Sequence, residues 1–201
     1  MPQQRPTTPV PTPPADAPEV VLFHLPITKD WLRQFVLAAT LSPSYGIYSG
    51  YESCENVPVR EGSEEYLDSE KYEVKARMLA GPLLPLIGRL NEIRQAHPAL
   101  QRFENLVWLD TQNDDLIAYA KRFGDDTIIT VINLDVGERR EGLCIVPDTL
   151  GLPTRFVATD LLTGDAYPWR TGRNFVGLEP GGSHVISVGS PEAPASKRRK
   201  R

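Results

Sequence analysis

Eight short apolar segments in the second half of this 201-residue chain constrain its fold most strongly. They span residues 105–110, 115–122, 127–134, 142–146, 155–159, 166–169, 174–178 and 183–188. The breaks between them carry residues typical of tight turns, among them Asn113-Asp114, Gly124-Asp125 and Gly181-Gly182. Because no helical pattern intervenes, these segments predict an antiparallel β-sandwich.

The first half of the chain has a different pattern, in which helices and strands alternate. Residues 20–26 are β-branched and apolar, which is typical of a strand. Apolar side chains then recur at helical spacing over residues 29–41, so we expect an amphipathic helix with Thr28 as its N-cap. Residues 46–52 are aromatic and contain two glycines, which predicts a short buried strand.

A second amphipathic helix is expected over residues 82–96. Its apolar side chains form one face, and His97-Pro98 ends it because proline cannot continue a helix. Helix, strand, long loop and helix in this order are typical of a parallel α/β sheet or barrel. The fold class is therefore α/β followed by all-β.

Charge and cysteine content exclude several classes of partner and compartment. The formal net charge is −4, yet residues 197–201 are all basic, and the remaining 17 Lys and Arg face 26 Asp and Glu. Such an acidic body argues against nucleic acid as a partner. No apolar run reaches the ~18 residues of a membrane helix, so we expect no membrane association. Cys54 and Cys144 lack metal-ligand spacing and are expected to be free thiols, which favours the cytoplasm.

Three long stretches then point to a family. LAATLSPSYGIYSGYE at 37–52, VREGSEEYLDSEKYE at 59–73 and LIGRLNEIRQAHPAL at 86–100 resemble the maltose-1-phosphate-dependent α-1,4-glucan maltosyltransferases, members of the α-amylase-like glycoside hydrolase superfamily. The resemblance implies the last elements of a truncated (β/α)8 barrel, followed by a C-terminal antiparallel β-sandwich. Residues 29–41 would be the seventh barrel helix, 46–52 the eighth strand and 82–96 the eighth helix.

The resemblance also implies which residues bind substrate. Lys71 and Tyr72 match the pair that contacts the maltosyl donor in the family. A lysine can donate hydrogen bonds to sugar hydroxyls, and a tyrosine offers a ring face and a hydroxyl. The alternative from spacing alone is that Lys71 is a surface ion-pair partner and Tyr72 a packing aromatic.

No catalytic residue is assigned within this chain. The family's nucleophile and acid/base follow barrel strands four and five, which would lie upstream of Met1. The Asn-x-Pro-Asp-like segment after strand seven has no counterpart in FHLPITKDWLRQF at 23–35, so Asp30 is not given its role. The eight acidic residues between Glu52 and Glu73 are expected to be solvated and paired with nearby basic residues. The mismatch and the proline-rich start predict a truncated or frame-altered gene product.

These expectations divide the chain into four parts: a disordered lead-in (1–19), a barrel remnant (20–102), a β-sandwich (103–190) and a basic disordered tail (191–201). The resemblance implies α-maltose 1-phosphate and α-1,4-glucan as partners, a retaining maltosyl transfer, no cofactor or metal, and a homodimer. The alternatives are a non-catalytic module that binds glucan or protein, or a gene product without function. Apolar faces of the two helices would be exposed unless they pack on the sandwich.

Overall fold

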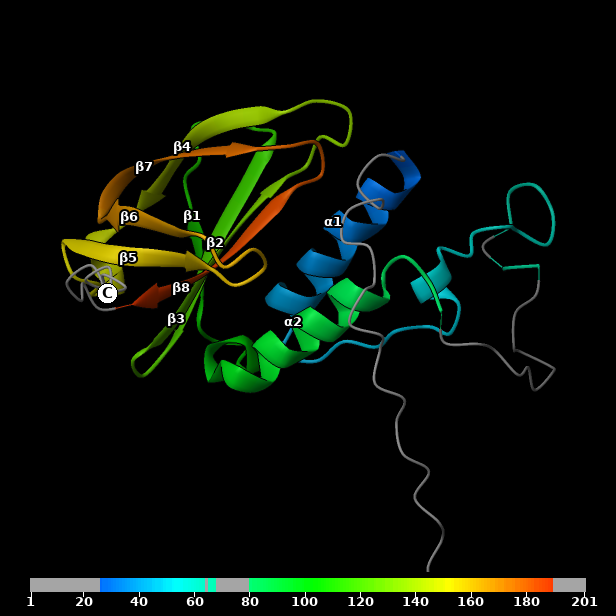
Figure 1. Ribbon diagram of the computed structural model, residues 1–201, viewed down its shortest axis with the longest axis horizontal. Coiled ribbons are helices and arrows are strands. Elements are labelled where there is room, and N and C mark those ends of the chain that lie inside the picture. Colours follow the sequence, from blue (N-terminus) through cyan, green and yellow to red (C-terminus); the bar gives the residue numbers. More distant parts are fainter. Residues whose placement is uncertain (1–25, 64, 68–79, 190–201) are drawn as a thin grey trace, which may run out of the picture.

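The structure is a computed structural model that describes residues 26–63, 65–67 and 80–189, with two helices packed against antiparallel strands (Figure 1). All eight predicted strands are confirmed, each within about two residues of the expected bounds. They are β1 Leu106–Leu109, β2 Leu116–Phe123, β3 Asp126–Asn133, β4 Arg140–Val146, β5 Arg155–Asp160, β6 Ala166–Arg170, β7 Gly172–Leu178 and β8 Ser183–Gly189.

The strands form two antiparallel sheets of unequal size. Six of them make one sheet in the order β1-β2-β3-β8-β5-β6, and β4 pairs with β7 in a second sheet. Ile129, Val131 and Ile186 of the large sheet share an apolar core with Val176 and Leu178 of the small one. The predicted antiparallel arrangement is therefore confirmed.

Two helices cover the other face of the large sheet. They are α1, Pro26–Leu41, and α2, Leu84–Ala96, and they lie side by side in Figure 1. A second core joins Phe35 of α1 and Leu90 of α2 to Tyr119, Ile132 and Val185 of the sheet. The central strands are thus covered on both faces. This explains why residues 127–133 read as an almost uninterrupted run of buried residues.

Two basic side chains fix the C-terminal end of α1. Arg94 of α2 donates hydrogen bonds to the carbonyl oxygens of Ala39, Ser42 (2.9 Å) and Pro43 (2.7 Å). The ammonium group of Lys121, on β2, donates to the carbonyl oxygen of Leu41 at 3.0 Å. The last carbonyls of a helix have no partner within the helix, so these contacts satisfy them and orient α1 on the sheet.

The expected start of the first helix is wrong. Thr28 is not an N-cap, because α1 begins two residues earlier, at Pro26, and proline is favoured in the first turn of a helix. Residues 20–25 of the other predicted segment, the strand over 20–26, lie outside the described residues. Its last residue, Pro26, is helical.

Residues 46–52 do not form the predicted buried strand. Ile47 and Tyr48 are exposed, and a short 3-10 helix follows at Tyr51–Ser53. A strand persists only where a neighbouring strand pairs with its backbone, and no described strand pairs with this segment. Local turn bonds form instead, among them Tyr51 N–H to the Tyr48 carbonyl at 3.0 Å.

Candidate functional site

The segment with the expected donor-binding residues is closed at its base by two hydrogen bonds. The Ser53 hydroxyl donates to the Ala80 carbonyl at 2.9 Å, and the Leu83 N–H donates to the Glu52 carbonyl at 3.2 Å. Residues 54–79 therefore leave and return at one place, next to the start of α2. We call this place the loop base, defined by residues 50–54 and 80–83.

Two glycines allow the chain to close there. The backbone of Gly50 has φ 101°, a conformation that other residues rarely adopt. A Cβ on Gly81 would lie 2.0 Å from the Glu52 carbonyl oxygen, so only glycine permits this approach. The Glu52 side chain is 5% exposed, and its carboxylate accepts a hydrogen bond from Gly50 N–H at 3.0 Å. Glu52 is thus a structural carboxylate of the loop base.

Tyr51 attaches the loop base to α1. Its hydroxyl donates to the Trp31 carbonyl at 3.0 Å, and its ring centroid lies 4.6 Å from that of Trp31 and 5.9 Å from that of Phe35. Burial raises the pKa of Tyr51 to about 12, and the nearby Cys54, Asp30 and Tyr66 act in the same direction. The phenol therefore stays protonated and can keep donating its hydrogen bond at neutral pH.

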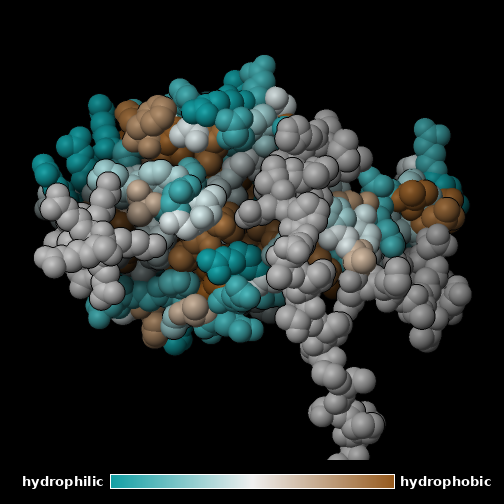
Figure 2. Space-filling view, viewed as in Figure 1, coloured by the Kyte–Doolittle hydropathy of each residue, from teal (hydrophilic) through white to brown (hydrophobic). Residues whose placement is uncertain are grey.

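Beyond its base, the described part of the loop presents apolar side chains to solvent. Its backbone doubles back on itself, with Val59 N–H bonded to the Glu65 carbonyl at 2.8 Å and Leu67 N–H to the Val57 carbonyl at 2.7 Å. The exposed apolar residues are Val57, Val59, Tyr66 and Leu67 of the loop, together with Ile47 and Tyr48, which directly precede its base. We call these six residues the loop patch. Figure 2 shows hydrophobic surface at this end of the molecule. Contiguous apolar surface of this kind is typical of a binding surface.

Lys71 and Tyr72 lie outside the described residues, so their expected contact with a donor stays a prediction. Among the described residues, no three His, Cys, Asp or Glu side chains are close enough to hold a metal ion. His97 instead pairs with Asp126 at 2.8 Å, and His184 pairs with the fully buried Asp160 at 2.7 Å. Both histidines therefore have structural partners. Cys54 and Cys144 are free thiols, as expected.

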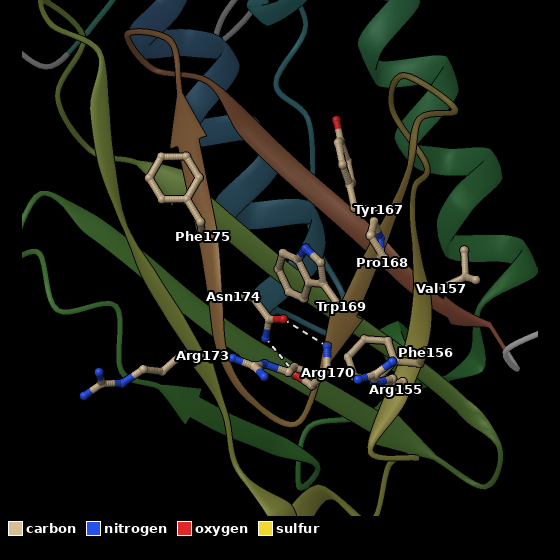
Figure 3. A pocket seen from close by; sticks show the side chains of 10 residues that line it. All are labelled: Arg155, Phe156, Val157, Tyr167, Pro168, Trp169, Arg170, Arg173, Asn174 and Phe175. Atoms are coloured by element: carbon tan, nitrogen blue, oxygen red, sulfur yellow. Dashed lines mark hydrogen bonds between the residues drawn. The ribbon is translucent and has the colours of Figure 1, made fainter.

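The sequence did not point to a third feature, a hollow beside the free edge of β6. Its lining comes from β5, β6 and β7 and includes three arginines and several aromatic residues (Figure 3). Trp169 belongs to this lining but is only 7% exposed, whereas Trp108, on β1, is 58% exposed. The register of the strands, which brings these arginines together, cannot be read from the sequence.

The chain is similar in sequence to one family of known proteins. Residues 108–188 match the family model described as "GLGE, C-terminal". Over 173 residues the chain is 50% identical to α-1,4-glucan:maltose-1-phosphate maltosyltransferase 2 of Streptomyces coelicolor, covering 80% of this chain and 26% of that protein. This chain is a relative of the maltosyltransferases. It is also 42% identical over 177 residues to the Corynebacterium glutamicum enzyme of that name, covering 82% of this chain and 26% of the enzyme.

The chain spans about a quarter of the length of the curated maltosyltransferases it matches. Solved structures with a similar fold are α-amylases. An α-amylase from Geobacillus thermoleovorans gives a TM-score of 0.61 at 16% identity, covering 84% of this chain and 34% of that chain. A maltogenic α-amylase from Thermotoga neapolitana gives a TM-score of 0.58 at 13% identity, covering 80% of this chain and 36% of that chain. At these identities the likeness concerns the fold alone.

Proposed function

We propose that this chain is the C-terminal portion of a maltosyltransferase that moves maltosyl units from α-maltose 1-phosphate to α-1,4-glucan with retention of configuration. The names of these relatives supply the reaction and both substrates. The observation that carries the proposal for this chain is the closed loop base. It holds both ends of the segment that contains Lys71 and Tyr72 against α1 and α2.

We further propose how the chain divides. Residues 20–102 form the end of an α-amylase-type barrel, with α1 and α2 as its last two helices, and residues 103–190 form the β-sandwich that follows. The likeness to α-amylases covers 80% to 84% of the chain, so it extends beyond the eight strands and supports this division. The lead-in (1–19) and the tail (191–201) lie outside the described residues.

In this proposal the chemistry is shared between this chain and the rest of the barrel. Lys71 and Tyr72 contact the donor, while the nucleophile and the acid/base belong to elements that this chain does not contain. Retaining transfer needs those two carboxyl groups ~5 Å apart on either side of the scissile bond. Glu52, the most buried carboxylate among the described residues of the loop and its base, accepts a hydrogen bond from Gly50 N–H and is not offered to a substrate.

The direct test is release of inorganic phosphate from α-maltose 1-phosphate with glycogen as the acceptor. We expect no release by this chain alone, and release when it is mixed with the complementary upstream part of the Streptomyces coelicolor relative. In that mixture, Lys71→Met and Tyr72→Phe are each expected to lower kcat/KM about 10-fold or more, the effect of losing a hydrogen bond to substrate. Release by the chain alone would overturn the assignment of the carboxylates. A stable but inactive mixture would overturn the proposed reaction.

A second candidate function is a non-catalytic protein-binding module, and the loop patch favours it. Its six exposed apolar side chains are the kind of surface that a protein partner covers. The same mixture separates the two candidates: association without phosphate release supports the module. A homodimer and a cytoplasmic location also belong to the proposal. No helix among the described residues is long and apolar enough to cross a membrane.

A further inference from the structure

The hollow beside β6 has a volume of about 620 Å³, which is in the range of small-molecule sites. It passes over the free edge of β6, because residues from both faces of that strand line it. Trp169 lies between β6 and β7, with Tyr167 on one side and Phe175 on the other (Figure 3). Phe175 is 64% exposed, so its ring is available to a ligand.

The charge of this hollow is unbalanced. Arg155 and Arg170 stand directly opposite each other in the β5–β6 register, and Arg173 of β7 completes the basic part of the lining. The lining contains no Asp or Glu. Like charges directly opposite in neighbouring strands repel each other. Within the described residues, none of the three guanidinium groups has a hydrogen bond or ion pair, whereas Arg140 pairs with Asp115, Asp135 and Glu138.

The backbone of the hollow is held in place by one buried side chain. The Asn174 amide accepts a hydrogen bond from Arg170 N–H at 2.9 Å and donates to the Arg170 carbonyl at 2.8 Å. It also donates to the Gly172 carbonyl at 3.2 Å. These bonds fix the turn between β6 and β7, and therefore the spacing of the strands that carry the arginines and aromatic rings. A site fixed before binding loses less entropy when a ligand arrives.

We infer that this hollow binds a saccharide that carries a phosphate group. Guanidinium groups match phosphate oxygens in charge and geometry, and a dianion between Arg155 and Arg170 would relieve their repulsion. The exposed ring of Phe175 offers an apolar face to a sugar ring. The two kinds of side chain would recognise different parts of one ligand. The arginines favour an oxyanion, and the aromatic side chains favour a sugar ring.

This inference does not rest on the proposed function. The hollow lies at the end of the β structure far from the loop base in Figure 1, so it is separate from the segment that contains Lys71 and Tyr72. A saccharide phosphate bound there would leave that segment free. The hollow is therefore a site for an additional saccharide phosphate.

The experiment follows the indole N–H signal of Trp169 by two-dimensional NMR of the full chain, assigned with Trp169→Phe. The probes are α-maltose 1-phosphate, maltose and inorganic phosphate. We expect a saturable shift with α-maltose 1-phosphate, and binding about tenfold or more weaker with either of the other two. Equal affinity for inorganic phosphate would overturn recognition of the saccharide. Equal affinity for maltose would overturn the role of the arginines, and no shift with any probe would overturn the site.

Three variants complete the test. Arg155→Gln with Arg170→Gln is expected to weaken α-maltose 1-phosphate binding about tenfold or more. Arg60→Gln, which removes one positive charge by the same substitution on the exposed loop, should leave this binding unchanged. Lys71→Met removes the proposed donor contact but should leave the concentration dependence of the Trp169 shift unchanged, which separates the hollow from that contact. The double variant should unfold at an equal or higher urea concentration, since it removes a repulsion. Unaltered binding by this folded variant would overturn the inference.

Discussion

The hydroxyl of Tyr119, on β2, donates a hydrogen bond to the hydroxyl of Thr40, on α1, across 2.5 Å. The direction follows from the partner of Thr40, whose hydroxyl proton is directed to the Val36 carbonyl at 2.7 Å. Both side chains are almost fully buried, and burial raises the pKa of Tyr119 to about 12. This bond is a direct contact between a buried side chain of β2 and one of α1, in addition to the bond from Lys121 to the Leu41 carbonyl.

A double-mutant cycle measures this contact. Thr40→Val leaves the buried Tyr119 hydroxyl without this acceptor, so we expect a loss of about 2 kcal/mol in the free energy of unfolding. Tyr119→Phe leaves the Thr40 hydroxyl bonded to the Val36 carbonyl, so the expected loss in the free energy of unfolding is about 1 kcal/mol. Urea unfolding of both single variants and the double variant should give a coupling near 1 kcal/mol. Strictly additive losses would show that the two hydroxyls do not interact.

Arg94 should be irreplaceable by lysine. Its guanidinium reaches three carbonyl oxygens at the end of α1 and lies 4.8 Å from the centre of the Tyr45 ring. An ammonium group cannot match this planar arrangement. Arg94→Met is expected to lower the free energy of unfolding by about 3 kcal/mol, measured by urea unfolding, and Arg94→Lys should lower it by almost as much.

The control for Arg94 lies one and a half turns earlier on the same helix. Arg89 donates to the Leu161 carbonyl at 2.8 Å and pairs with Glu92 at 3.3 Å, but its side chain is 48% exposed. Arg89→Met is therefore expected to cost less than about 1 kcal/mol. Equal losses for the two arginines would contradict the role assigned to Arg94 at the end of α1.

The loop base depends on the missing side chain of Gly81. Gly81→Ala places a methyl group 2.0 Å from the Glu52 carbonyl oxygen, so residues 80–83 and 52–53 must separate. We expect faster hydrogen exchange at Leu83 N–H and faster proteolysis between residues 54 and 79. Gly88→Ala is the matched control: a Cβ there meets no atom within 4 Å, and alanine in α2 should add about 1 kcal/mol of stability. Unchanged exchange at Leu83 in Gly81→Ala would contradict this account of the closure.

Alkaline pH should destabilise the β core through Cys144. Burial raises the pKa of its thiol from 9.0 to about 12, and the nearby Asp110 adds to the shift. The folded state then holds a proton that the unfolded state releases, so stability present below pH 9 is lost as pH rises from 9 towards 12. The full shift corresponds to roughly 4 kcal/mol.

Urea unfolding at pH 7.5, 9.5 and 10.5 isolates this effect when Cys144→Ala is compared with the parent. The variant is less stable at pH 7.5 because it leaves a cavity. Its stability should fall less steeply above pH 9, and contributions from Tyr51, Tyr119 and Lys121 are common to both proteins and cancel. Parallel curves would mean that the thiol does not titrate in this range.

The strands were predictable because their evidence is local. Alternation or runs of apolar residues between turn residues mark each strand from 105 to 188, and the structure forms all eight. α2 was predictable for the same reason, since its apolar spacing ends at His97-Pro98. The helical spacing of α1 was also correct, but its start was not, because the helix begins at Pro26 and not after Thr28.

Residues 46–52 show where local evidence failed. Aromatic and β-branched composition, together with the family resemblance, predicted a strand. A strand, however, is a property of a pair of segments, and no described strand lies beside this one. Local sequence evidence could not predict the basic hollow for the same reason. Arg155 and Arg170 are 15 positions apart and become neighbours only through the β5–β6 register.

The resemblance to the maltosyltransferases, the eight strands and the apolar faces of both helices could be recognised in the sequence, because each depends on residue types at short spacing. Tertiary structure alone decided which surfaces those faces meet. It placed α1 and α2 on the large sheet through the core around Phe35 and Leu90, and it divided the strands between sheets of six and two. It also closed the loop base at Gly81. The physical reason is that packing and pairing join residues far apart in the chain, and their partners are specified only when the whole core forms.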